Sequence, residues 1–183
     1  LMSRFFGDLI QVGYVVRDLE DVMAYWATHL GIGPWFFLPH LAVPDFVYYG
    51  QPFIIDISLA LANSGSVQIE LIQQHNDVPS MYKYFLDPGP VPIRESGGVQ
   101  HLGYGTHDFT GAMDKALAAG YVVAQQGTGG NRGPFAYLCT EWHRGTVIEL
   151  MDMAHGRAEL FAGIAAAARG WDGSDPVRTR LPI

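Results

Sequence analysis

Four polar residues occupy equivalent places in a sequence repeat. Gln11 opens the segment Gln-Val-Gly-Tyr, and His101 opens His-Leu-Gly-Tyr at an offset of 90 residues. Each copy later contains an Ile-Glu-Leu run, which carries Glu70 in the first copy and Glu149 in the second. Amide oxygens, imidazole nitrogens and carboxylate oxygens all bind divalent metal ions. The pattern therefore predicts one metal site to which each copy contributes two ligands.

The four candidates differ in the polarity of the strand face on which each side chain lies. Because side chains alternate across a strand, Glu149 and Gln11 each share a face with apolar residues. An unpaired carboxylate in such surroundings is costly, so Glu149 is expected to be protonated, paired or metal-bound. Glu70 shares its face with Gln68, and that face is polar enough to be ordinary surface. Glu70 is therefore the weakest of the four, and the repeat is what favours its inclusion.

A strand followed by an amphipathic helix is expected in each copy. Residues 9–16 form a mostly apolar run that is typical of a buried strand. Asp18 then caps a helix whose apolar positions recur at helical spacing up to Gly31. In the second copy a strand containing His101 precedes a helix that begins at Asp108. The remaining strands are expected at residues 35–38, 53–61 and 67–72, and near residues 121, 135 and 147.

The fold class is therefore α+β, built from two tandem β-α-β-β-β modules. A proline- and glycine-rich stretch, residues 87–92, separates residues 1–92 from a second module at residues 93–153. Each module alone would expose one face of its sheet, so the two should pack into a single unit. Residues 154–183 form an alanine-rich helix and an extended tail that have no counterpart in the first copy. We expect them to serve in docking or dimerisation.

The charge and composition of the chain indicate which classes of binding partner to expect. The net charge is −7 with only 11 lysines and arginines, spread without a basic stripe, so neither nucleic acid nor an anionic membrane is expected as a partner. No stretch approaches the roughly 20 apolar residues of a membrane span. Cys139 is the single cysteine, which indicates a reducing, cytoplasmic location.

In this order, the motifs resemble those of the vicinal oxygen chelate superfamily, which includes glyoxalase I, methylmalonyl-CoA epimerases, extradiol dioxygenases and bleomycin or fosfomycin resistance proteins. The resemblance covers roughly residues 8 to 153 and rests on segments 11–19, 69–71, 101–104 and 148–150. It implies a cup-shaped mixed sheet around a divalent ion held by Gln11, Glu70, His101 and Glu149. This set is more similar to that of glyoxalase I than to the His/Gln/His/Glu set of the epimerases.

The resemblance also implies a reaction. Such a donor set suits Zn, Ni, Co or Mn, which would polarise a carbonyl and stabilise an enediolate while a carboxylate shifts the proton on the adjacent carbon. Glu149 is the first candidate for that catalytic base and Glu70 the second. The expected activity is that of a lactoylglutathione-lyase-like or acyl-CoA-epimerase-like enzyme, acting as a homodimer on a small-molecule carbonyl or thioester substrate.

Two other functions stay open. An extradiol dioxygenase would hold Fe(II) with two histidines and one glutamate, which Gln11 and the additional Glu70 disfavour. A metal-free binding or resistance protein would have no need for two buried glutamates. One aromatic-rich segment either lines the mouth of a substrate site or belongs to the core and a dimer face. It comprises Trp35, Phe36, Phe37, Tyr48, Tyr49 and Phe53.

Overall fold

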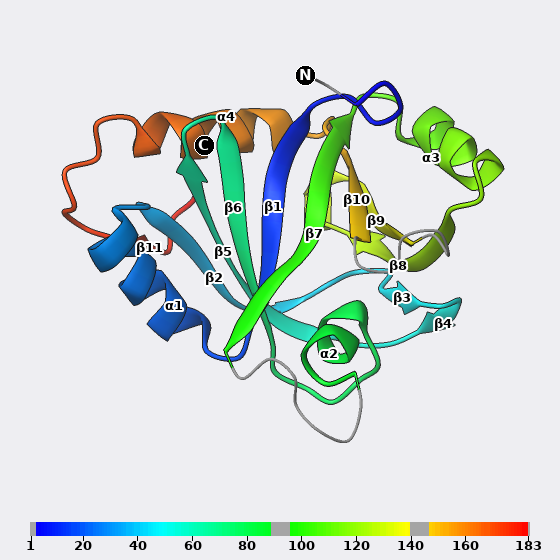
Figure 1. The fold of residues 1–183 in the computed structure, drawn as a ribbon, viewed down its shortest axis with the longest axis horizontal. Helices are drawn as coiled ribbons and strands as arrows, with labels where there is room; N and C mark the ends of the chain where they lie inside the picture. The colour runs from blue at the N-terminus through cyan, green and yellow to red at the C-terminus, as the bar shows by residue number, and fades with distance from the viewer. Residues whose placement is uncertain (1–2, 89–95, 140–146, 183) are drawn as a thin grey trace.

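The computed structural model describes residues 3–88, 96–139 and 147–182. Its centre is a mixed, curved sheet with the strand order β11-β2-β5-β6-β1-β7-β10-β9-β8-β3-β4 (Figure 1). The strands are β1 (Leu9–Val16), β2 (Trp35–Ala42), β3 (Val47–Tyr48), β4 (Gln51–Pro52), β5 (Asp56–Ser64), β6 (Val67–Gln74), β7 (Gly97–Thr106), β8 (Val122–Thr128), β9 (Pro134–Cys139), β10 (Val147–Asp152) and β11 (Val177–Arg178). The helices are α1 (Leu19–Tyr25), α2 (Met81–Leu86), α3 (Phe109–Ala118) and α4 (Arg157–Ala168).

The two predicted modules meet at the middle of this sheet. Strand β1 pairs in antiparallel fashion with β7, while β6 runs parallel to β1 and β10 runs parallel to β7. The resulting order β6-β1-β7-β10 places the strands of Glu70, Gln11, His101 and Glu149 side by side. The α+β fold class and the joint sheet are thus confirmed. The predicted boundary at residue 92 lies outside the described residues.

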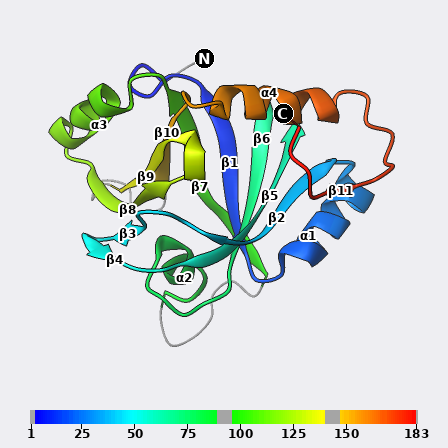
Figure 2. The ribbon, with the colours of Figure 1, turned by 180° about the vertical axis from the view of Figure 1, so that it is seen from behind.

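Both predicted helices begin at an aspartate cap. The Asp18 carboxylate accepts a hydrogen bond from the Asp21 backbone N–H at 3.0 Å, and the Asp108 carboxylate accepts one from the Gly111 N–H at 2.9 Å. Helix α1 continues as a π-helical turn, Trp26–Leu30, and ends at Gly31 with a left-handed φ of 64°. In both views the two helices lie on opposite flanks of the sheet (Figures 1 and 2).

Several boundaries differ from the expectation. Strand β2 runs past the expected end at residue 38 because a register irregularity between Leu38 and Leu41 lets its pairing with β5 resume. His40 lies in this irregularity with a φ of 48°. Strand β5 starts at Asp56, later than expected. The pattern also contained no signal for α2, β3, β4 or β11, which are short or irregular.

Helix α4 packs against the sheet of its own chain. It contacts β5, and its buried residues Leu160 and Ile164 form a cluster with Phe36 and Leu61. Beyond the helix, β11 pairs in parallel with β2. Figure 1 shows α4 crossing the sheet near the ends of β5 and β6. Helix α4 thus docks on the sheet of its own chain, and a role in dimerisation stays a prediction. Among the described residues, no helix is long and apolar enough to cross a bilayer.

Candidate metal centre

Gly13 of β1 stands between two of the candidate ligands. It is paired with Glu70 across the parallel β1–β6 ladder and with His101 across the antiparallel β1–β7 ladder. A methyl group at Gly13 would lie 1.8 Å from Cε1 of the His101 ring, which is far inside contact distance. Only glycine therefore lets the imidazole lie over β1 beside the Glu70 carboxylate.

Gly103 of β7 has the equivalent place in the second copy. It is paired with Gln11 on β1 and with Glu149 on β10. A methyl group at Gly103 would lie 2.9 Å from Cβ and 3.0 Å from Oε1 of Gln11. The glycine of each repeated tetrapeptide thus makes room for a candidate ligand from the neighbouring strand. The repeat contained this signal, because both tetrapeptides have glycine at their third position.

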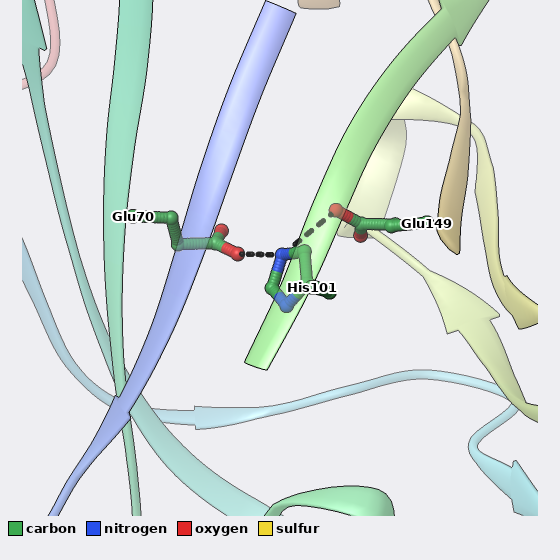
Figure 3. A group of neighbouring side chains, drawn as sticks. All are labelled: Glu70, His101 and Glu149. Carbon is green, nitrogen blue, oxygen red and sulfur yellow. Dashed lines mark ion pairs between the residues drawn. The ribbon is translucent and has the colours of Figure 1, made fainter. Parts of the chain in front are cut away.

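Three of the candidate side chains converge in the structure. Nε2 of His101 lies 3.3 Å from a Glu70 oxygen and 3.2 Å from a Glu149 oxygen, and the two carboxylates approach the imidazole from opposite sides (Figure 3). One ligand atom from each residue lies within 4.8 Å of the other two. The exposed fractions are 9% for Glu70, 1% for His101 and 5% for Glu149. Two carboxylates buried this closely repel one another unless a cation lies between them.

The side chain of Gln11 lies at the same cavity as two of these residues. Its side chain is buried and lines one cavity together with Glu70 and Glu149. The Gln11 amide donates from Nε2 to Oε1 of Gln68 at 2.8 Å, whereas Gln11 Oε1 has no hydrogen-bond partner among the described residues. The amide is thus oriented with its oxygen free to accept or to coordinate.

Unpaired polar atoms provide a test of whether the site fits a metal ion. Among the described residues, Gln11 Oε1 is buried without a hydrogen-bond partner, and His101 Nε2 and Glu149 Oε2 are buried with an ion pair at 3.2 Å but no hydrogen bond. Buried polar atoms without hydrogen bonds are costly, so three in one site indicate that a further partner fits there. With a Glu70 oxygen, they form a set of three oxygen donors and one nitrogen donor, which suits a divalent ion such as Zn, Ni, Co or Mn.

The sequence left the surroundings of Glu70 open, and the structure shows them to be buried. Its strand face was polar enough to be ordinary surface, but Glu70 is only 9% exposed and Gln68 only 2%. The face is covered because it turns toward the second module and the cavity. Alternation along one strand shows which residues share a face, but not what packs against that face.

Two glutamines orient the candidate ligands from outside the site. The His101 ring donates from Nδ1 to Oε1 of Gln100 at 2.7 Å, which leaves Nε2 directed at the carboxylates. Gln68 holds the Gln11 amide in the corresponding way. Such contacts fix the tautomer and orientation of metal ligands and raise their basicity.

Removing the Gln100 acceptor should weaken metal binding. Gln100→Leu leaves the His101 Nδ1–H without its acceptor, so we expect metal affinity to fall about 10- to 100-fold. Competition with a chromophoric chelator measures this affinity. Gln51→Leu, on the exposed strand β4, is the matched control and should bind metal like the wild type. Equal affinities in all three proteins would contradict an orienting role for Gln100.

The electrostatics of the metal-free site favour a charged imidazole. Burial lowers the pKa of His101, but the nearby carboxylates of Glu149 and Glu70 outweigh burial and raise this pKa to about 9. Burial raises the pKa of Glu70, although its contact with His101 opposes that shift. In the metal-free protein, the positive charge of the His101 imidazolium therefore balances the negative charge of the nearby carboxylates.

This proton must leave when a metal binds, so metal binding should depend on pH. Since the His101 pKa is raised from 6.5 to about 9, its contribution to the stability of the metal-free protein is complete below pH 6.5 and is lost as pH rises through about 9. The stabilisation by a fixed free metal concentration should therefore grow from about pH 6.5 to about pH 8.5, by at most ~1.4 kcal/mol per pH unit. Melting curves with and without metal measure it. A gain independent of pH would contradict ligation by His101.

The candidate ligands lie at a mostly apolar cavity of about 390 Å³. Its apolar walls include residues of β2, β5 and α4, and of these elements α4 has no counterpart in the repeat. The size and lining are those of a small-molecule pocket. The aromatic-rich segment was one candidate for the mouth of a substrate site, but none of its six aromatic residues lines this cavity. Trp35 and Phe36 are instead buried in the core. The apolar lining includes Leu38, Leu41, Ile57, Leu59, Leu160 and Phe161.

Several polar cavity residues were missed by the sequence analysis, among them two tyrosines and two arginines. Tyr82 of α2 and Tyr137 of β9 are fully buried, with their hydroxyl groups 3.1 Å apart. The Tyr137 ring centroid lies 4.9 Å from that of His101. Burial raises the pKa of both phenols well above the ordinary value, so both are neutral hydrogen-bonding groups. Arg157, at the start of α4, and Arg132 also line the cavity.

Comparisons with known proteins agree with this architecture. A methylmalonyl-CoA epimerase from Mycobacterium tuberculosis superposes with a TM-score of 0.59 and 19% identity, over 87% of this chain and 96% of that chain. A hypothetical protein from Bacillus halodurans C-125 gives 0.57 and 18%, over 79% and 93%. A second methylmalonyl-CoA epimerase gives 0.53 and 15%, over 82% and 97%. At these identities the likeness shows the fold alone.

Sequence comparison identifies the family. No curated protein matches the chain. Residues 10–137, however, match the family described as the Glyoxalase/Bleomycin resistance protein/Dioxygenase superfamily. This match spans most of both modules, and it includes three of the four candidate ligands, Gln11, Glu70 and His101. The chain therefore belongs to the Glyoxalase/Bleomycin resistance protein/Dioxygenase superfamily, also called the vicinal oxygen chelate superfamily.

Proposed function

We propose that this protein is a metal-dependent lyase or isomerase that moves a proton on a carbon next to a carbonyl group. The observation that supports it best is the convergence of two buried glutamates and one imidazole at an otherwise apolar cavity. Such a cavity excludes water from a reacting carbanion-like centre, and its few polar groups are those that proton transfer requires.

Each residue has a proposed role. Gln11, Glu70, His101 and Glu149 would hold one divalent ion, Zn, Ni, Co or Mn. When bound, the ion supplies a Lewis acid for a substrate carbonyl. Glu149 would then remove the proton, because its side chain is buried and lines the cavity in which the substrate would lie. Glu70, which also lines the cavity, is the alternative base.

The proposed substrate is a small carbonyl compound or thioester. Apolar side chains dominate the cavity wall, which favours a short carbon chain over a polar one. Two of the similar structures are named as methylmalonyl-CoA epimerases, so 2-methyl acyl thioesters join 2-oxoaldehyde hemithioacetals as candidates. We also propose that the protein acts as a homodimer.

The two alternatives are less well supported. An extradiol dioxygenase centre requires two histidines, whereas the cluster among the described residues contains His101 with two glutamates. A metal-free binding protein would leave the carboxylates of Glu70 and Glu149 buried around one imidazole without a function. Metal analysis of the purified protein separates these classes, since iron would favour the dioxygenase and a protein unable to bind metal would favour the binder.

Hydrogen exchange tests the proposal directly. The metal-loaded protein is incubated in D₂O with 2-oxoaldehyde hemithioacetals and 2-methyl acyl-CoA thioesters. We expect at least one compound to gain deuterium on the carbon beside its carbonyl, or to be converted by internal proton transfer. Chelation should stop the reaction and added metal should restore it. If no compound is turned over or exchanged by the metal-loaded protein, the proposal is wrong.

A further inference from the structure

Two arginines line the same cavity as the candidate ligands. Arg157 begins α4 and is only 6% exposed, and Arg132 lies in the loop between β8 and β9. Neither forms an ion pair with a carboxylate of the described residues. Arginine is rarely buried unless it is paired, so an unpaired guanidinium at 6% exposure needs an explanation.

Backbone carbonyl groups accept hydrogen bonds from only some of the N–H donors of the Arg157 guanidinium. Nη1 donates to the carbonyl oxygens of Asp152 at 2.7 Å and Pro134 at 3.0 Å, and Nη2 donates to that of Gly133 at 3.1 Å. A guanidinium has five N–H donors. Among the described residues, Nε–H and one Nη2–H therefore have no acceptor, and neutral carbonyls leave the positive charge unbalanced.

The carboxylate of Asp152 on β10 does not supply the missing acceptor. One Asp152 oxygen accepts from the Ala154 N–H at 2.9 Å, and the other lies 3.2 Å from Nδ1 of His155. Burial lowers the pKa of Arg157, and the negative charges of Glu149, Asp152 and Glu70 only partly offset it. A divalent ion would neutralise the two glutamates, and the charge of Arg157 would then favour an anion in the cavity.

The backbone beside Arg157 is shaped to hold its guanidinium. A methyl group at Gly129 would lie 2.6 Å from Nη2 of Arg157, so glycine at this position leaves space for the planar head. Arg132 is held nearby, since its Nη1 donates to the carbonyl oxygen of Gly156 at 2.7 Å. Gly156 immediately precedes Arg157, and this bond ties the two arginines to one place in the cavity wall.

We propose that Arg157, assisted by Arg132, binds a carboxylate group of the substrate. The substrate class is then a carbonyl compound that also carries a carboxylate on its carbon chain. A planar guanidinium with two free N–H donors is suited to a carboxylate. The inference rests on the proposed function, because it places this carboxylate in the cavity where the proton transfer would occur.

Binding of matched acids and esters tests the inference. Calorimetry on the metal-loaded protein compares 2-, 3-, 4- and 5-oxohexanoate with their methyl esters. We expect at least one acid to bind about 10- to 100-fold more tightly than its ester, the range for charge-assisted hydrogen bonds. Arg157→Met should abolish this preference without weakening the ester, and Arg157→Lys should reduce it. Arg169→Met, at the exposed end of α4, should leave it unchanged.

The outcomes separate the two proposals. If no acid is preferred by the wild type, or if Arg157→Met weakens acid and ester equally, the carboxylate site is wrong even where proton exchange proceeds. If proton exchange fails but the acid preference is present and depends on Arg157, only the proposed function is wrong. Should Arg157→Met not fold, Arg157→Lys and Arg132→Met must each reduce the preference, and an unchanged preference in either variant would overturn the inference.

Discussion

Glu149→Gln should lower turnover by about 10²–10⁴, the usual contribution of a positioned base. The amide retains the shape of the side chain and an oxygen donor, but it cannot accept the substrate proton. Because Glu149 is buried in the cavity wall, no solvent-exposed group can easily replace it. Initial rates of exchange or conversion at saturating metal measure the effect.

The matched variant for this test is Glu70→Gln. It makes the same chemical change on the other side of His101, and comparing the metal content of the two variants separates loss of metal from loss of the base. We expect Glu149→Gln to retain metal when the ion is in excess and still to be slow. Full activity in Glu149→Gln, with loss of activity in Glu70→Gln, would make Glu70 the base instead.

Gly13→Ala should disrupt the candidate site and destabilise the fold. The new methyl group would lie 1.8 Å from the His101 ring, so the ring must leave its position between the carboxylates. Overpacking of this kind lowers the free energy of unfolding by about 1–3 kcal/mol. Metal affinity should fall by at least ~100-fold, since displacing a ligand should exceed the usual effect of losing its supporting contact. Denaturant unfolding and chelator competition measure the two effects.

Gly98→Ala is the control on the adjacent strand β7. A methyl group there would meet Cζ of Phe85 at 3.7 Å, an ordinary contact distance, so stability and metal affinity should stay close to those of the wild type. If Gly13→Ala behaves like Gly98→Ala, then His101 does not occupy the space over β1 that the site requires.

The sequence predicted the centre of the fold because that part is repeated. Two copies of one pattern identify equivalent strands, and equivalent strands of paired modules lie side by side, so Gln11 and His101 could be placed on neighbouring strands. The aspartate caps of α1 and α3 could be predicted because capping is local. The convergence of His101 with Glu70 and Glu149 followed from the same argument.

The cavity beyond the repeated strands could not be predicted in this way. Arg157 and Tyr82 lie on α4 and α2, which have no counterpart related by the repeat, and they reach the site through packing between distant segments. Local periodicity contains no information on such contacts. For the same reason the pattern made Glu70 the weakest of the four candidates, because what covers its face is contributed by other parts of the chain.

Locating a bound metal ion tests the central claim most directly. Crystals of the protein grown with Zn, Ni, Co or Mn are measured at the absorption edge of that metal, and anomalous scattering then identifies the position of the ion. We predict one ion per chain, bound by Gln11, Glu70, His101 and Glu149. An ion found only elsewhere, or a metal-free protein that still exchanges the substrate proton at the full rate, would contradict the account.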